Sequence, residues 1–206
     1  SMEASSELRI ELLDFQREFY SESAELFNIS DVKGYVFGEN GDPAVRSKLV
    51  EILLQHNIEV NGLAGAITVD GTQYRPGTSY LISLDQPQIR LIKSLFEPAF
   101  TFTDSLFYDV STWTFPFAFN TPYAPLTTTK ALENITGEPI TAQKVQKGSL
   151  QGDANGVGYL FSWKDYYAPQ ALYSILAEGL NAQVVTEPIA YQNQHINQSF
   201  DYGSVF

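Results

Sequence analysis

The chain has 206 residues, with 24 acidic and 12 basic side chains, two histidines, no cysteine and a formal charge of −12. The absence of cysteine excludes disulfides, thiolate zinc sites, iron–sulfur clusters and a cysteine nucleophile. The negative charge argues against nucleic-acid binding, which needs clustered Lys and Arg to neutralise phosphates. No apolar run approaches the roughly 20 residues of a membrane-spanning helix.

The first 30 residues differ in pattern from the rest of the chain. Ser1-Met2 is typical of a tag remnant. After it, Leu8, Leu12, Phe15 and Phe19 recur at helical spacing between acidic residues. We expect residues 1–30 to be a tag remnant and a linker helix that packs on the following domain through one face. Alternatively, the helix joins something upstream.

Residues 34–60 have the pattern of a β-α-β unit. Residues 33–38 have strand composition, and Asp42-Pro43 is a strong helix start because Asp can cap free N–H groups and Pro supplies a helical φ. The helix should end near His56-Asn57, since Asn tolerates a left-handed backbone. A second strand should begin at Ile58. The helix between them predicts strands that are parallel neighbours or near neighbours.

The next segment predicts a hairpin, a strand and a helix. Residues 67–74 carry an Asp-Gly turn between two short strands, and residues 79–84 read as a buried strand. Asp85 and Gln88 have capping-box spacing before a helix that should end at Glu97-Pro98.

The strand-helix-strand pattern recurs about 124 positions later. Gly158-Tyr159-Leu160-Phe161 matches Gly34-Tyr35-Val36-Phe37, a helix should stop at Gly179, and residues 182–185 have strand composition. Any two β-α-β units share this pattern, so we take the repeat only as support for an α/β class. The last strand candidate, residues 203–206, reaches the end of the chain, which suggests a fragment of something longer.

These elements predict the α/β class, with an open, mostly parallel sheet flanked by helices in a Rossmann-like arrangement. We expect residues 31–206 to form this domain, after the N-terminal helix of residues 1–30.

One set of residues has the spacing of a zinc site. His56 and Glu59 form a His-x-x-Glu motif, and His195 lies far downstream. Two imidazoles and a carboxylate leave zinc an open position for water, as in zinc carboxypeptidases. The context argues against it, because His56 falls at the end of a helix and Glu59 in a strand pattern. We assign no catalytic, metal or cofactor-binding residue, and we expect no cofactor in this chain.

Other candidate sites are weaker. The loop Gly38–Gly41 stands where a phosphate loop would, but Glu39 and Asp42 would repel an anion. Ser162 follows a strand and precedes a helix without the glycines of a nucleophile elbow. Asp104 and Asp109 could act as a carboxylate pair in a cleft, although Asp104 is better explained as a cap. An aromatic tract over residues 100–123 suggests a core or interface patch, or a stacking surface for sugars or peptides.

Several segments of the sequence carry a family resemblance. They resemble the region that follows the peptidase domain in large bacterial zinc carboxypeptidases of the M14 type, over about residues 8–206. The segments are residues 33–38, 52–60, 86–97, 104–114 and 166–172, of which Asp104-Ser105-Leu106-Phe107-Tyr108-Asp109-Val110-Ser111-Thr112-Trp113-Thr114 is the most specific.

The resemblance implies an accessory domain similar to class I glutamine amidotransferase-like domains, carried by secreted or periplasmic enzymes. In such proteins the zinc ligands and the catalytic glutamate belong to the preceding peptidase domain, so none is carried over to this chain. The amidotransferase activity would need a cysteine that the chain lacks.

We therefore expect a non-catalytic accessory domain of a multidomain zinc carboxypeptidase-like protein, periplasmic or secreted. Its expected partners are the peptidase domain of the parent chain and a peptide or glycan, with no nucleic acid and no membrane span. One alternative is a metallocarboxypeptidase that uses His56, Glu59 and His195. Another is a free-standing ligand-binding module with its pocket at the carboxyl ends of strands 34–37, 79–84 and 158–161.

Overall fold

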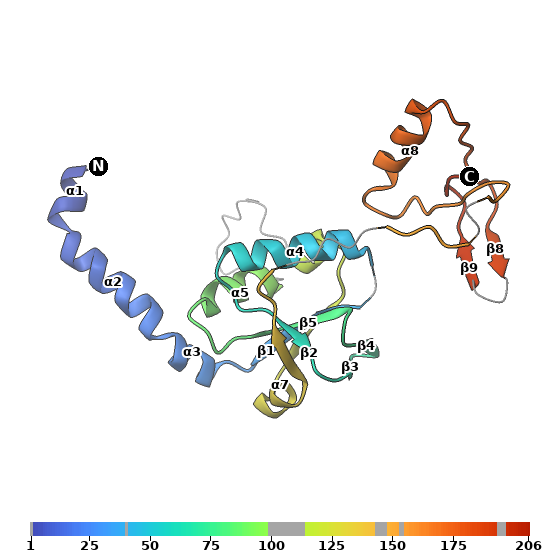
Figure 1. Cartoon of the computed structure of the whole chain (residues 1–206). Coiled ribbons are helices and arrows are strands. Elements are labelled where there is room, and N and C mark those ends of the chain that lie inside the picture. The colour runs from blue at the N-terminus through green and yellow to red at the C-terminus, as the bar shows by residue number, and fades with distance from the viewer. Residues whose placement is uncertain (1, 40, 99–113, 143–147, 153–154, 193–196) are drawn as a thin grey trace, which may run out of the picture. The chain divides into compact units, whose positions relative to one another are not determined.

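The chain forms two compact units (Figure 1). The computed structural model describes residues 2–39, 41–98, 114–142, 148–152, 155–192 and 197–206. The N-terminal unit comprises Ser1–Gly41 and Arg46–Gln143, and the C-terminal unit comprises Asp42–Val45 and Lys144–Phe206.

The N-terminal unit begins with three helices in succession: α1 (Met2–Glu7), α2 (Arg9–Ser21) and α3 (Ser23–Ile29). No side chain of α2 is buried, and Leu12 and Phe15 are 51% and 66% exposed. The packing predicted for this apolar stripe is therefore wrong at these two positions. Contact with the rest of the unit begins further along the helix, where the Arg90 guanidinium lies 4.5 Å from the centre of the Phe19 ring.

A five-stranded sheet forms the centre of the N-terminal unit. Its strand order is β6-β1-β5-β2-β7, and every neighbouring pair is antiparallel. A separate hairpin pairs β3 with β4. The strands are β1 (Gly34–Gly38), β2 (Asn61–Leu63), β3 (Ile67–Val69), β4 (Thr72–Tyr74), β5 (Ser79–Ser83), β6 (Tyr123–Leu126) and β7 (Thr136–Pro139).

The predicted open parallel sheet is therefore wrong. The chain does cross from β1 to β2 through a helix, and these strands run parallel to each other because each is antiparallel to β5 between them. The strand-helix-strand pattern gave the relative direction of β1 and β2, but not that of β5, which lies between them and runs antiparallel to both. All five residues of β1 are buried, as is typical where both faces of a sheet are covered.

Both faces of this sheet are covered. Tyr35, Phe37 and Ile82 face the helices α4 (Pro43–Gln55) and α5 (Ile89–Phe96). Val36 and Leu81 face the other side, where they pack with residues of the hairpin and of α7 (Thr129–Ile135). Figure 1 shows α4 and α5 on one side of the strands and α7 on the other. A short helix, α6 (Phe115–Ala118), precedes β6.

Several predicted boundaries are confirmed in the N-terminal half of the chain. The helix α4 begins at Pro43, the Ala44 N–H donates to the Asp42 carboxylate at 2.7 Å, and Asn57 has a φ of 55° just after the helix. The Asp-Gly turn joins β3 to β4 as expected. The predicted capping box is wrong, because α5 begins at Ile89 with Gln88, and not Asp85, as its N-cap, and Gln88 makes no side-chain capping bond.

The C-terminal unit contains α8 (Ala168–Ala177) and a hairpin of β8 (Ile189–Gln192) with β9 (Asn197–Phe200). Gly179 has a φ of 75° after the helix, which confirms the predicted stop. The strands predicted at 158–161 and 182–185 are each only a single β-bridge, in which Phe161 and Val184 both pair antiparallel with Val205.

The two units share one arrangement of elements. In each, a helix joins two extended segments, a hairpin follows, and a later segment pairs antiparallel with both of the first two. The later segment centres on Leu81 in the N-terminal unit and on Val205 in the C-terminal unit, about 124 residues further on. The sequence repeat therefore corresponds to a repeat of structure and not merely to two elements of the same class.

Candidate functional site

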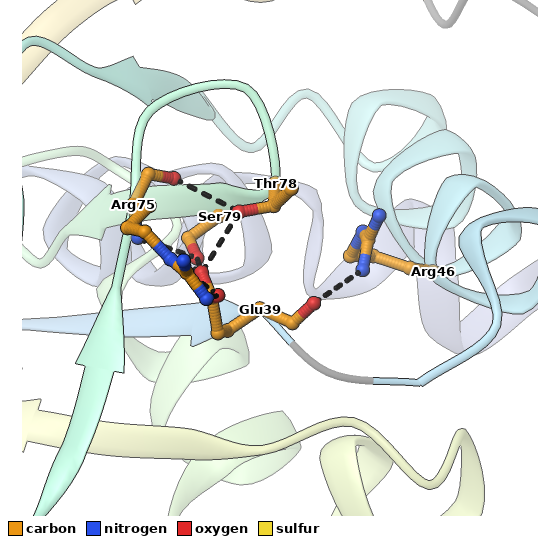
Figure 2. Close-up of polar contacts among 5 residues, drawn as sticks. All are labelled: Glu39, Arg46, Arg75, Thr78 and Ser79. Carbon is orange, nitrogen blue, oxygen red and sulfur yellow. Dashed lines mark hydrogen bonds and ion pairs between the residues drawn. The ribbon is translucent and has the colours of Figure 1, made fainter. Parts of the chain in front are cut away.

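A buried carboxylate lies where β1 ends in the N-terminal unit. Glu39 follows the last residue of β1, its backbone has a φ of 67°, and its side chain is only 5% exposed. The Glu39 N–H donates to the Thr78 carbonyl at 3.1 Å, which ties the strand end to the turn that precedes β5. Figure 2 shows the side chains that surround this carboxylate.

The acceptor positions of the Glu39 carboxylate are filled by neighbouring donors. The Arg75 backbone N–H donates at 3.0 Å and its Nε–H at 2.7 Å, and the Arg75 Nη2 completes an ion pair. The Thr78 hydroxyl donates at 2.8 Å and the Ser79 hydroxyl at 3.3 Å. Hydrogen bonds from Arg75 hold the pKa of the Glu39 carboxyl below its ordinary value.

A second arginine fixes the backbone at the same point. The Arg46 side chain extends from α4, and its Nη1–H donates to the Glu39 carbonyl at 3.3 Å. Arg46 is 5% exposed. Because the Glu39 carboxylate and carbonyl both have partners, this cluster joins the end of β1 to the start of β5.

The C-terminal unit has a pocket of about 240 Å³. Two segments form it, one directly after Phe161 and one that runs from β9 to the residue before Val205. Phe161 and Val205 exchange two backbone hydrogen bonds of 3.0 Å, which hold the two segments side by side. The lining residues are Ser162, Trp163, Lys164, Gln198, Ser199, Phe200, Asp201, Tyr202 and Ser204.

Aromatic and neutral polar groups dominate this pocket. Trp163 and Tyr202 are 45% and 76% exposed. Among the described residues of the lining, the two charged side chains, Lys164 and Asp201, form an ion pair with each other. The hydrogen bond to Asp201 raises the pKa of the Lys164 ammonium above its ordinary value.

The pocket occupies the same place in its unit as the Glu39 cluster. The Glu39 cluster lies where β1 ends and β5 begins, and the pocket lies directly after Phe161 and directly before Val205. Trp163 stands 124 positions after Glu39, and Ser199 and Tyr202 stand at the same distance from Arg75 and Thr78. In the N-terminal unit this place is filled by the protein's own carboxylate, whereas in the C-terminal unit it is open.

Of the three residues with the spacing of a zinc site, the structure describes His56 and Glu59. The His56 Nδ1 lies 2.9 Å from the Ile52 carbonyl oxygen, and the Glu59 N–H donates to the Gln86 side chain at 2.8 Å. His195 lies outside the described residues. Among those that are described, no group of three His, Asp or Glu side chains could hold a metal ion.

The remaining candidates have varied outcomes. The Ser162 hydroxyl accepts from the Lys164 N–H at 3.1 Å and lines the pocket, in the turn predicted for it. Asp104, Asp109 and the aromatic residues up to Trp113 lie outside the described residues. Of the rest of the aromatic tract, Phe115, Phe119 and Tyr123 pack against the core and Phe117 is 58% exposed.

The ligand site suggested at shared carboxyl strand ends is not formed in the N-terminal unit. Gly38, at the carboxyl end of β1, pairs with Ser79 at the amino end of β5. The carboxyl ends of these strands therefore lie at opposite edges of the sheet. Sequence reasoning missed Trp163 and Tyr202, although the repeat at 124 residues already aligned them with the segments around Glu39 and Thr78.

Comparison with known proteins adds no relative. No protein-family model, no curated protein and no solved structure matches the chain. Within the described ranges, no helix combines the length and the apolar content that are needed to cross a bilayer.

Proposed function

We propose that the chain is a non-catalytic accessory domain of a multidomain zinc carboxypeptidase-like protein, periplasmic or secreted, and that it binds the substrate of its parent. The resemblance of residues 104–114 and the other segments to M14-type proteins supports the parent. The peptidase domain of that parent would be the partner within the same polypeptide.

The observation that carries the binding role is the pocket of the C-terminal unit. Its counterpart in the N-terminal unit is closed by Glu39 and has a structural role. Exposed aromatic side chains beside hydroxyl and amide groups are typical of sites that bind ligands.

A sedimentation assay with insoluble cell-wall peptidoglycan tests this role, because that polymer contains both peptide and glycan. We expect the full chain to sediment with it, and Tyr202→Ala to reduce the bound fraction. Tyr173→Ala is the matched control, since Tyr173 and Tyr202 are both 76% exposed and Tyr173 lies on α8 outside the pocket lining. A chain that stays in the supernatant, or a loss that is equal in both variants, would contradict the proposal.

A further inference from the structure

The pocket of the C-terminal unit has features that narrow the class of ligand. It is somewhat smaller than the roughly 300–1,000 Å³ that is common for drug-sized ligands. A volume of about 240 Å³ suits one ring of a sugar chain or one side chain of a peptide. The choice between these two depends on the charge and shape of the lining.

The charge of the pocket disfavours an ionic ligand. Lys164 and Asp201 pair with each other, and the other lining residues that the structure describes are neutral. A peptide terminus, a carboxylate or a phosphate would need a free charge of opposite sign. Glu39 shows the contrast, because in the N-terminal unit the equivalent place holds a carboxylate with the help of the Arg75 guanidinium.

The shape of the lining favours a flat, amphipathic ligand. Trp163 and Tyr202 line the pocket and are 45% and 76% exposed, and a sugar ring offers an apolar C–H face that can lie on an aromatic ring. Around these rings, the hydroxyl and amide groups of Ser162, Gln198 and Ser199 can donate to and accept from sugar hydroxyls. These groups can replace some of the hydrogen bonds that the sugar hydroxyls make to water.

Backbone hydrogen bonds hold the segments that form the pocket. Two backbone hydrogen bonds between Phe161 and Val205 hold together the segments on both sides of the pocket. Ser204, which precedes Val205, is 3% exposed. The Ser204 carbonyl accepts from the Val185 N–H at 2.8 Å. The aromatic rings therefore stand on an anchored backbone, so that less entropy is lost when a ligand binds.

From these observations we infer that the pocket of residues 162–164 and 198–204 binds a neutral glycan, with Trp163 and Tyr202 as the stacking surfaces. This inference rests on the proposed function and names the substrate class of its site. The cell-wall glycan strand, rather than the peptide, is then the part of the polymer that the domain contacts.

Calorimetry and amide chemical-shift mapping of the full chain, with chitotetraose and with tetraalanine as probes, test the inference. We expect saturable binding of chitotetraose and shifts confined to residues 162–164 and 198–204. Tyr202→Ala should weaken binding about tenfold, the factor that corresponds to roughly 1.4 kcal/mol. Trp163→Ala should weaken it similarly, and Tyr173→Ala should leave it unchanged. Raising the salt concentration should also leave it unchanged, because no net charge takes part.

Three results would overturn the inference: binding of tetraalanine alone at these residues, shifts elsewhere in the chain, or chitotetraose binding that is insensitive to both pocket variants. In each case, peptidoglycan sedimentation that is lost in Tyr202→Ala would leave the accessory role standing. Failure to sediment would count against the proposed function itself.

Discussion

Replacing Glu39 with alanine removes the acceptor that joins the end of β1 to the turn before β5. The Arg75 side chain is 59% exposed, so water solvates its guanidinium after the change and most of the ion-pair energy is not lost. The Thr78 hydroxyl keeps a bond to the Arg75 carbonyl at 3.2 Å, and the Arg75 N–H keeps the Ser79 hydroxyl at 3.3 Å. The net loss is therefore roughly one charge-assisted hydrogen bond, which corresponds to a decrease in stability of about 2 kcal/mol.

Amide hydrogen exchange in β1 and β5 measures this change directly, because the two units need not unfold together. A loss of about 2 kcal/mol lowers protection there by roughly thirtyfold. Glu51→Ala is the control, since Glu51 is 47% exposed in a surface ion pair with Lys48 and its removal should change stability by less than about 0.5 kcal/mol. Equal protection in Glu39→Ala and Glu51→Ala would refute the structural role of the cluster.

The same carboxylate predicts a pH dependence. Because folding lowers the pKa of Glu39, its contribution is fully present above the ordinary value of 4.5 and is lost as the pH falls through the lower, folded value. Glu39→Gln should remove this part of the acid sensitivity of β1 and β5. A difference between Glu39→Gln and the wild type that stays constant as the pH falls below 4.5 would contradict the argument.

Two further predictions concern matched glycines and a buried tyrosine. Gly34→Ala should cost about 3 kcal/mol, because the added Cβ would stand 2.5 Å from the Ile82 backbone oxygen. Gly158→Ala should cost less than about 1 kcal/mol, since the added Cβ would meet only the half-exposed Phe206 ring, which can move. Hydrogen exchange in each unit measures the two losses of stability. A larger loss for Gly158→Ala than for Gly34→Ala would contradict the packing. Burial raises the pKa of Tyr35 to about 12, so Tyr35→Phe should remove a tyrosine that ionises near pH 12 in an ultraviolet titration and not one that titrates near 10.

The local elements of this fold could be predicted because their signals lie within a few residues. Asp42 and Asn57 marked the ends of α4, and the Asp-Gly turn marked the first hairpin. The pairing of strands could not be predicted in the same way, because nothing in the pattern of β1 states that β5 inserts between it and β2. Periodicity reports which faces are buried, not which strand lies beside which.

The candidate site, like the strand pairing, depends on contacts between segments that are far apart in the sequence, so local patterns could not predict it. The pocket joins Trp163 to Tyr202 across 39 positions, and neither residue belongs to a motif with a fixed spacing. The repeat of about 124 residues was the one available signal. If the repeat had been treated as a shared fold, it would have given Trp163 the position in the C-terminal unit that is equivalent to Glu39 in the N-terminal unit.

The claim that this chain binds and does not cleave is tested most directly by a combined metal and activity measurement. After zinc loading and removal of excess metal, we expect no stoichiometric zinc and no release of C-terminal residues from peptide substrates. Stoichiometric zinc with residue release, both abolished by His56→Ala, would contradict it and support a metallocarboxypeptidase that uses His56, Glu59 and His195.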